Sequence, residues 1–90
     1  MVYEKTTSLA ADDVLAAATR FFAQRNPASS AFLEKAGPGW EIFRGQGGEE
    51  IALATVAEGA NTRVRGSSLL FDQLVDRFLS ILPAADELSP

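Results

Sequence analysis

The 90-residue chain contains no cysteine and no histidine, and only one Trp, one Tyr and one Met. Without cysteine there is no disulfide, no thiolate nucleophile and no cysteine-ligated zinc. Without histidine, the side chain most often used as a general base near neutral pH is missing, and catalysis of the Ser-His-Asp and Cys-His kinds is excluded. We therefore predict a protein that is not an enzyme and that holds no metal and no cofactor.

Basic side chains are also few. The chain has 8 Lys and Arg against 12 Asp and Glu, a net charge of -4, and a pI of about 4.6. Nucleic-acid-binding domains usually carry a basic surface, so no nucleic acid is expected as a partner. No apolar run approaches the ~20 residues that span a bilayer, and Met1 to Lys5 lack the apolar segment of a signal peptide. We expect a soluble, acidic, cytoplasmic protein with no membrane span.

The length and composition predict one folded unit. A chain of 90 residues with 47% hydrophobic residues is expected to form a single globular domain. We assign residues 1–83 to this α+β domain. Residues 84–90 follow Pro83, are acidic and have little to bury, which predicts a flexible C-terminal tail.

The first half of the chain is expected to begin with a strand and a helix. Residues 2–7 are rich in β-branched and aromatic side chains, which predicts a short strand. Apolar residues at three- and four-residue spacing predict an amphipathic helix over residues 9–25, with Ser8 as its N-cap.

A second, short helix is expected next. Asn26 is a good N-cap, and Pro27 is favoured at the first helical position. We expect this helix to carry Phe32 and Leu33 and to stop at the Gly-Pro-Gly of residues 37–39.

The second half predicts an antiparallel meander followed by a closing helix. Strands are expected over residues 40–44, 50–57 and 62–66, and a helix over residues 69–82. The predicted fold is therefore α+β, with the order β-α-(short α)-β-β-β-α. It has an antiparallel sheet of about four strands, and two main helices pack on one of its faces.

The turns predict the register of this meander. Two-residue turns at residues 47–48 and 59–60 make both hairpins agree on which face is apolar. The helix-facing side is then expected to hold Trp40, Ile42, Ile51, Leu53, Thr55 and Val64. The outer face is expected to hold Glu41, Phe43, Ala52, Ala54, Val56, Arg63 and Arg65.

The outer face is the most informative feature of the predicted sheet. Its candidate partner-binding residues are Phe43, Ala52, Ala54, Val56, Arg63 and Arg65. Three uses stay open: a solvated sheet face, a contact surface for a second copy or another protein, and a shallow small-molecule or anion site. Our main functional hypothesis is a small non-enzymatic domain of unknown role, either a homodimer or a binder of a protein partner, that acts through this face.

The arginines on this face have two possible roles. Arg63 and Arg65 project from the same side of one strand, and such a pair either binds an anion or is neutralised by Glu41 and Glu58. Arg44 is expected on the helix side, with its stem covering apolar surface.

Two segments resemble parts of a known architecture. Tyr3 to Leu15 (YEKTTSLAADDVL) looks like the entry segment, and Leu69 to Leu82 like the closing helix, of the helix-grip or START-like superfamily. This superfamily includes pollen-allergen-like and polyketide-cyclase-like proteins. The resemblance covers the element order of most of the chain and implies a reduced helix-grip fold, because family members usually have more strands. It carries over no functional residue.

An alternative function accompanies this resemblance. A miniature helix-grip module would bind a small apolar ligand between the sheet and the closing helix. The candidate ligand-binding residues are Trp40, Phe71, Leu74 and Phe78. For Trp40 itself the sequence favours a core anchor over a ligand contact, because Ile42 and Leu53 share its predicted face.

Overall fold

The computed structural model describes residues 2–23, 31–69 and 71–85. These residues form five strands and two helices, so the α+β class is confirmed. The elements are β1 (Val2–Thr7), α1 (Ala11–Ala23), β2 (Ala31–Gly37), β3 (Trp40–Gly45), β4 (Glu50–Glu58), β5 (Asn61–Ser68) and α2 (Asp72–Ile81). The predicted C-terminal tail lies mostly outside the described residues.

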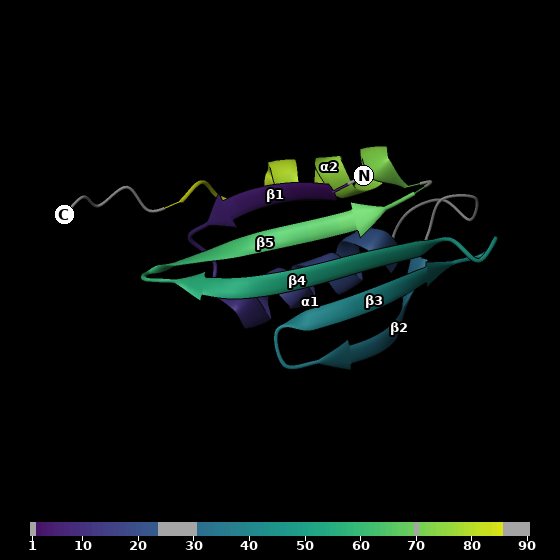
Figure 1. Cartoon of the computed structure of the whole chain (residues 1–90), viewed down its shortest axis with the longest axis horizontal. Helices are drawn as coiled ribbons and strands as arrows, with labels where there is room; N and C mark the ends of the chain where they lie inside the picture. The colour runs from purple at the N-terminus through teal and green to yellow at the C-terminus, as the bar shows by residue number, and fades with distance from the viewer. Residues whose placement is uncertain (1, 24–30, 70, 86–90) are drawn as a thin grey trace.

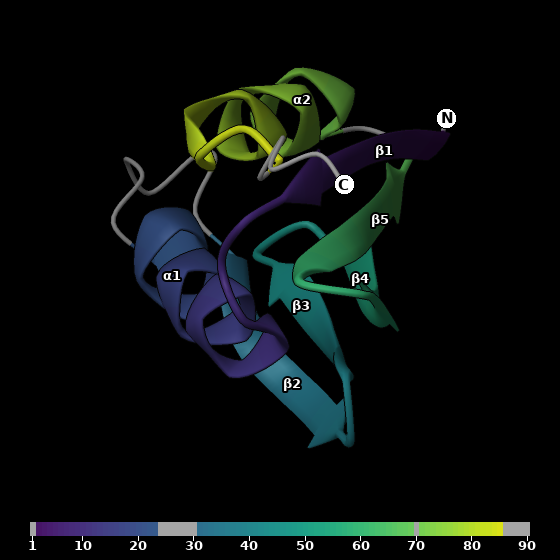
Figure 2. The ribbon, with the colours of Figure 1, turned by 90° about the vertical axis from the view of Figure 1, so that its left-hand side faces the viewer.

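The five strands form one antiparallel sheet in the order β1-β5-β4-β3-β2 (Figure 1). Each of the three hairpins joins neighbouring strands, and β1 pairs with the last strand, β5. Both helices lie on the same side of the sheet (Figure 2). The prediction of two helices on one face is therefore right, but the sheet has five strands rather than about four.

The fifth strand is the segment that we expected to be a short helix. Residues 31–37 form β2, which pairs antiparallel with β3 from Ala31–Gly45 to Gly37–Trp40. Pro38 and Gly39 form the turn between them, and Gly39 has a φ of 80°. Pro followed by a positive-φ Gly is typical of a type II turn, so the signal that we interpreted as a helix stop turns a hairpin instead. The predicted N-cap at Asn26 lies outside the described residues.

The register of the first predicted hairpin is wrong by one residue. We expected a two-residue turn, but Arg44 pairs with Glu50 and Phe43 with Ile51. Gly45 N–H donates to the carbonyl oxygen of Glu49 at 2.8 Å, which leaves a three-residue loop. Its last residue, Gly48, has a φ of 89°. A third loop residue in the left-handed region is a common hairpin solution, and it reverses the facing of β3.

The register of the second predicted hairpin is confirmed. Ala54 pairs with Arg65, Thr55 with Val64, and Glu58 with Asn61. Gly59 is the first residue of the two-residue turn and has a φ of 63°, as a type II′ turn requires.

The core lies between the inner face of the sheet and the two helices. Phe22 of α1, Phe43 of β3 and Phe78 of α2 are all completely buried. The ring centroid of Phe22 lies 5.0 Å from that of Phe43 and 5.5 Å from that of Phe78. One aromatic cluster therefore joins the first helix, the sheet and the last helix. It is surrounded by buried Val14, Ala18, Ile51, Leu53, Val64, Val75 and Leu79.

The helix α2 begins three residues later than predicted but is fixed at both ends. The hydroxyl of Ser68 accepts the backbone N–H of Phe71 at 3.0 Å, at the start of the helix. The ammonium group of Lys5 donates to the carbonyl oxygen of Leu82 at 2.9 Å. A cation at a helix C-terminus opposes the negative end of the helix dipole, so Lys5 also links β1 to α2.

The close approach of α2 to the sheet depends on Gly66. A Cβ atom at this position would lie 2.7 Å from Cγ1 of Val75 and 3.0 Å from Cδ2 of Leu53. The side chain of Val75 therefore lies directly on the backbone of β5, where a side chain larger than hydrogen has no room.

We predict that Gly66→Val destabilises the protein by about 1–3 kcal/mol, because the added methyl groups overpack the contact between β5 and α2. The free energy of unfolding from urea titration measures this effect. Ser67→Val is the matched control, since Ser67 is the next residue of β5 and faces the opposite side. Equal stability of the two variants would contradict the described packing.

Candidate functional site

One face of the sheet is open to solvent, and we call it the outer face. It carries Ala52, Ala54 and Val56 of β4 and Arg63 and Arg65 of β5. Val56 is 55% exposed. These five residues lie on the predicted face, because they alternate along the strands with Leu53 and Val64, which are buried on the helix side.

The sixth predicted residue, Phe43, does not lie on this face. Because the facing of β3 is reversed, Phe43 is completely buried under the helices. Trp40, Ile42 and Arg44 take the outer positions of β3 instead, beside the outward residues of β4. A three-residue loop after Gly45, in place of the predicted two-residue turn, would have predicted these outward positions from the sequence.

Trp40 presents a partly open aromatic surface on the outer face. The side chain is 38% exposed. Its indole packs against Gly37 of β2, where a Cβ atom would lie only 2.5 Å from Cε2 and Nε1 of the ring. The lack of a side chain on Gly37 therefore lets the indole lie against the neighbouring strand, with its remaining surface toward solvent.

The two arginines of β5 differ in how well they are neutralised. Arg63 forms an ion pair with Glu58 at 2.9 Å, as one of the two predicted roles required. Arg65 lies 3.9 Å from Glu4, at the limit of an ion pair, and its side chain is 63% exposed. Exposed ion pairs of this length contribute little energy, so the guanidinium group of Arg65 is available for another contact.

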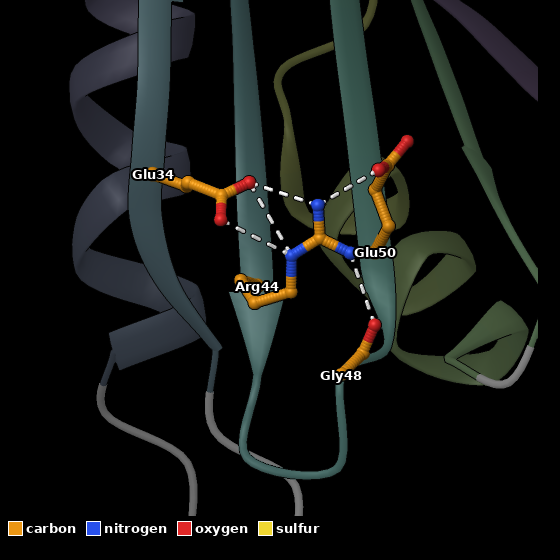
Figure 3. A network of polar contacts seen from close by, with 4 residues as sticks. All are labelled: Glu34, Arg44, Gly48 and Glu50. Carbon is orange, nitrogen blue, oxygen red and sulfur yellow. Dashed lines mark hydrogen bonds and ion pairs between the residues drawn. The ribbon is translucent and has the colours of Figure 1, made fainter.

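Arg44 is held by three neighbouring groups at one corner of the outer face (Figure 3). Its guanidinium donates to the carboxylate of Glu34 at 2.8 Å, to that of Glu50 at 3.1 Å and to the carbonyl oxygen of Gly48 at 3.0 Å. Hydrogen bonding to Arg44 lowers the pKa of Glu34 below its ordinary value. The expected position of Arg44 on the helix side is wrong. These contacts join β2 and β4 across β3, and they occupy the hydrogen-bond donors of the Arg44 guanidinium.

Glu34, one of these partners, stands at an irregularity of the edge strand. The register of β2 against β3 shifts between Leu33 and Lys35, so Glu34 is an extra residue of β2. A bulge and a charged side chain both discourage pairing of an edge strand with another chain. The edge at β2 is therefore poorly suited to sheet extension, in contrast to the open face.

The four predicted ligand-binding residues do not line one chamber. Phe78 is completely buried in the aromatic cluster, whereas Trp40 lies on the opposite face of the sheet. Leu74 and Phe71 are half-buried and pack against the core. A Cβ atom on Gly45 would lie 2.9 Å from Cε2 of Phe71, so this ring is in contact with the sheet.

An open groove of about 600 Å³ lies elsewhere, beside the β3–β4 hairpin tip. It is lined by Val2 and by residues 47–50 and 67–69, none of which belongs to the predicted ligand set. Within residues 2–23, 31–69 and 71–85, no cluster of three carboxylates suited to a metal ion was found. Neither helix of the described chain is long and apolar enough to cross a membrane.

Glu41 is a buried carboxyl that the sequence analysis placed on the wrong face. It is 8% exposed and lies on the helix side, two residues from Phe43, so it cannot neutralise Arg63. The Thr19 hydroxyl lies 3.3 and 3.4 Å from the two Glu41 oxygens, and it donates to the carbonyl oxygen of Leu15 at 3.1 Å. The single proton of this hydroxyl is therefore shared between the carbonyl oxygen of Leu15 and the Glu41 carboxyl group.

Comparisons with protein-family models, with curated proteins and with solved structures found no match to this chain.

We predict that Glu41 makes the protein less stable as the pH rises. Burial raises the pKa of Glu41 above its ordinary value of 4.5, while hydrogen bonding to Thr19 opposes this shift. Below the ordinary pKa both the folded and unfolded states hold the proton. As the pH rises toward the folded pKa, the unfolded state releases the proton first, and stability is lost.

Glu41→Gln removes this titration, so its stability relative to the original protein is expected to increase with pH above about 4.5. Urea titrations between pH 4 and pH 8 measure the difference. Glu4→Gln, which alters an exposed carboxyl, is the matched control. Parallel pH profiles of the original protein and Glu41→Gln would show that Glu41 is not protonated preferentially in the folded state.

Proposed function

We propose that this chain is a small non-enzymatic α+β domain that acts by binding a protein, either a second copy or another partner, through the outer face of its sheet. The observation that carries the proposal is the asymmetry of the sheet. Both helices cover one face, whereas the other presents Trp40, Ile42, Ala54 and Val56 on adjacent strands. Contiguous exposed apolar residues bordered by charges are typical of protein-binding surfaces.

The surroundings of this patch support a protein partner over a small anion. Arg44 already uses its donors on Glu34, Glu50 and Gly48, and Arg63 is paired with Glu58. An anion site needs several converging donors without such partners. The lack of cysteine fits the reducing cytoplasm, which we propose as the location of the protein.

The resemblance to the helix-grip superfamily remains a proposal. Its support is the element order: an entry strand and helix, an antiparallel meander, and a closing helix on the same face as the first. A ligand held between the sheet and α2 has less support, because the described interior there is filled by Phe22, Phe43 and Phe78.

We predict that a photo-reactive phenylalanine analogue at position 56 forms a covalent adduct with a protein in intact cells, because Val56 is 55% exposed on the outer face. The mass of the adduct distinguishes a second copy from another partner. Position 81 is the matched control, since Ile81 is 60% exposed but lies on α2.

Val56→Asp is expected to abolish the contact, measured with the analogue placed at position 42, whereas Ile81→Asp preserves it. Circular dichroism establishes that both variants fold. If position 56 gives no adduct, or gives no more than position 81, the outer face is not the binding surface.

A further inference from the structure

We infer that the partner of the outer face is a second copy of this chain, packed across a two-fold axis parallel to β4 so that Arg65 of each copy lies over Trp40 of the other. This inference rests on the proposed function and adds the identity and orientation of the partner. Its basis is the arrangement of three outward residues in one row across the sheet.

The row contains Arg65, Ala54 and Trp40 on three adjacent strands. Ala54 pairs with Arg65 on one side and with Trp40 on the other. Arg65 and Trp40 thus lie one strand spacing, about 4.8 Å, on either side of β4. A two-fold axis above Ala54 and parallel to β4 keeps the position along the strand and exchanges its two flanks. It therefore places each Arg65 over the Trp40 of the other copy.

The two side chains are chemically matched. Trp is the best aromatic acceptor of a cation, and a guanidinium stacks on its face. Part of the indole surface of Trp40 is covered by Gly37, and the side chain remains 38% exposed. The side chain of Arg65 is 63% exposed, and its ion pair with Glu4 is long, at 3.9 Å. The same face therefore holds both halves of a contact that it does not make within one chain.

The residues on the axis permit close approach of the two sheets. Ala52 and Ala54 have the smallest side chains of the outer face, and the axis places each β4 against the other β4. Sheets packed face to face lie about 10 Å apart, and larger side chains on the flanks then interdigitate. The patch covers three strands, so the interface is small, and we expect association only at high protein concentration.

A partner other than a second copy would not require Arg65 and Trp40 to lie in one row as a matching cation and aromatic ring. Two other arginines of the face are already paired: Arg63 with Glu58, and Arg44 with Glu34 and Glu50. These two side chains are therefore not free to bind an acidic partner. A second copy supplies both an aromatic ring for Arg65 and a guanidinium for Trp40.

The test is a dissociation constant from sedimentation equilibrium over a wide range of concentrations. Trp40→Leu and Arg65→Gln each remove both symmetry-related contacts and are expected to raise the dissociation constant about tenfold. Arg63→Gln is the matched control, because Arg63 lies on the same strand and face but in a different row. It is expected to change the dissociation constant by less than about twofold.

Mixing the two variants provides a second, independent measurement. A mixed dimer of Trp40→Leu with Arg65→Gln retains one of the two contacts, whereas either variant alone retains none. The mixed dimer is therefore expected to be about three- to fivefold tighter than either variant alone. Neither substitution changes the core, so unfolding does not account for this recovery.

The outcomes separate this inference from the proposed function. A dimer that Val56→Asp disrupts, but that Trp40→Leu and Arg65→Gln leave unchanged, would overturn the orientation while supporting the outer face as the surface. A protein that stays monomeric at every concentration would overturn the second copy as partner. The proposed function would then depend on an adduct of different mass at position 56.

Discussion

The register between β3 and β4 is the constraint on which most of this structure depends. Gly48, with a φ of 89°, closes a three-residue loop and thereby places Phe43 under the helices. There Phe43 contacts Phe22, which in turn contacts Phe78 of α2. A slip of one residue would turn Phe43 outward and Trp40 inward, and the aromatic cluster that joins both helices to the sheet would be lost.

The same register decides the chemistry of the outer face. It brings Trp40, Ile42 and Arg44 to the side where β4 and β5 present small apolar residues and arginines. Arg44 and Arg63 are paired within the chain, but Arg65 is not well neutralised. The face is therefore an apolar strip with the loosely paired Arg65 on its flank.

Some elements were predictable because their signals have one interpretation. Gly59-Ala60 between two strands permits a tight two-residue turn, and the β4–β5 register followed from it. The Gly-rich segment after Arg44 permits loops of two or three residues, so the facing of β3 was predicted wrongly. Gly37-Pro38-Gly39 ends a helix as readily as it turns a hairpin, and β2 was missed for that reason. Of the seven predicted outer-face residues, Glu41 and Phe43 lie on the helix side instead.

The sequence by itself determined which chemistry is unavailable, because no fold can supply a thiol or an imidazole that the chain lacks. It also determined the two amphipathic helices and the β4–β5 hairpin, since periodic apolar residues and a tight turn act locally. Only the tertiary structure decided the fifth strand, the burial of Glu41 and the exposure of Trp40. These depend on partners far along the chain: β3 gives β2 its hydrogen bonds, and Phe22 and Phe78 provide the buried contacts that favour an inward Phe43.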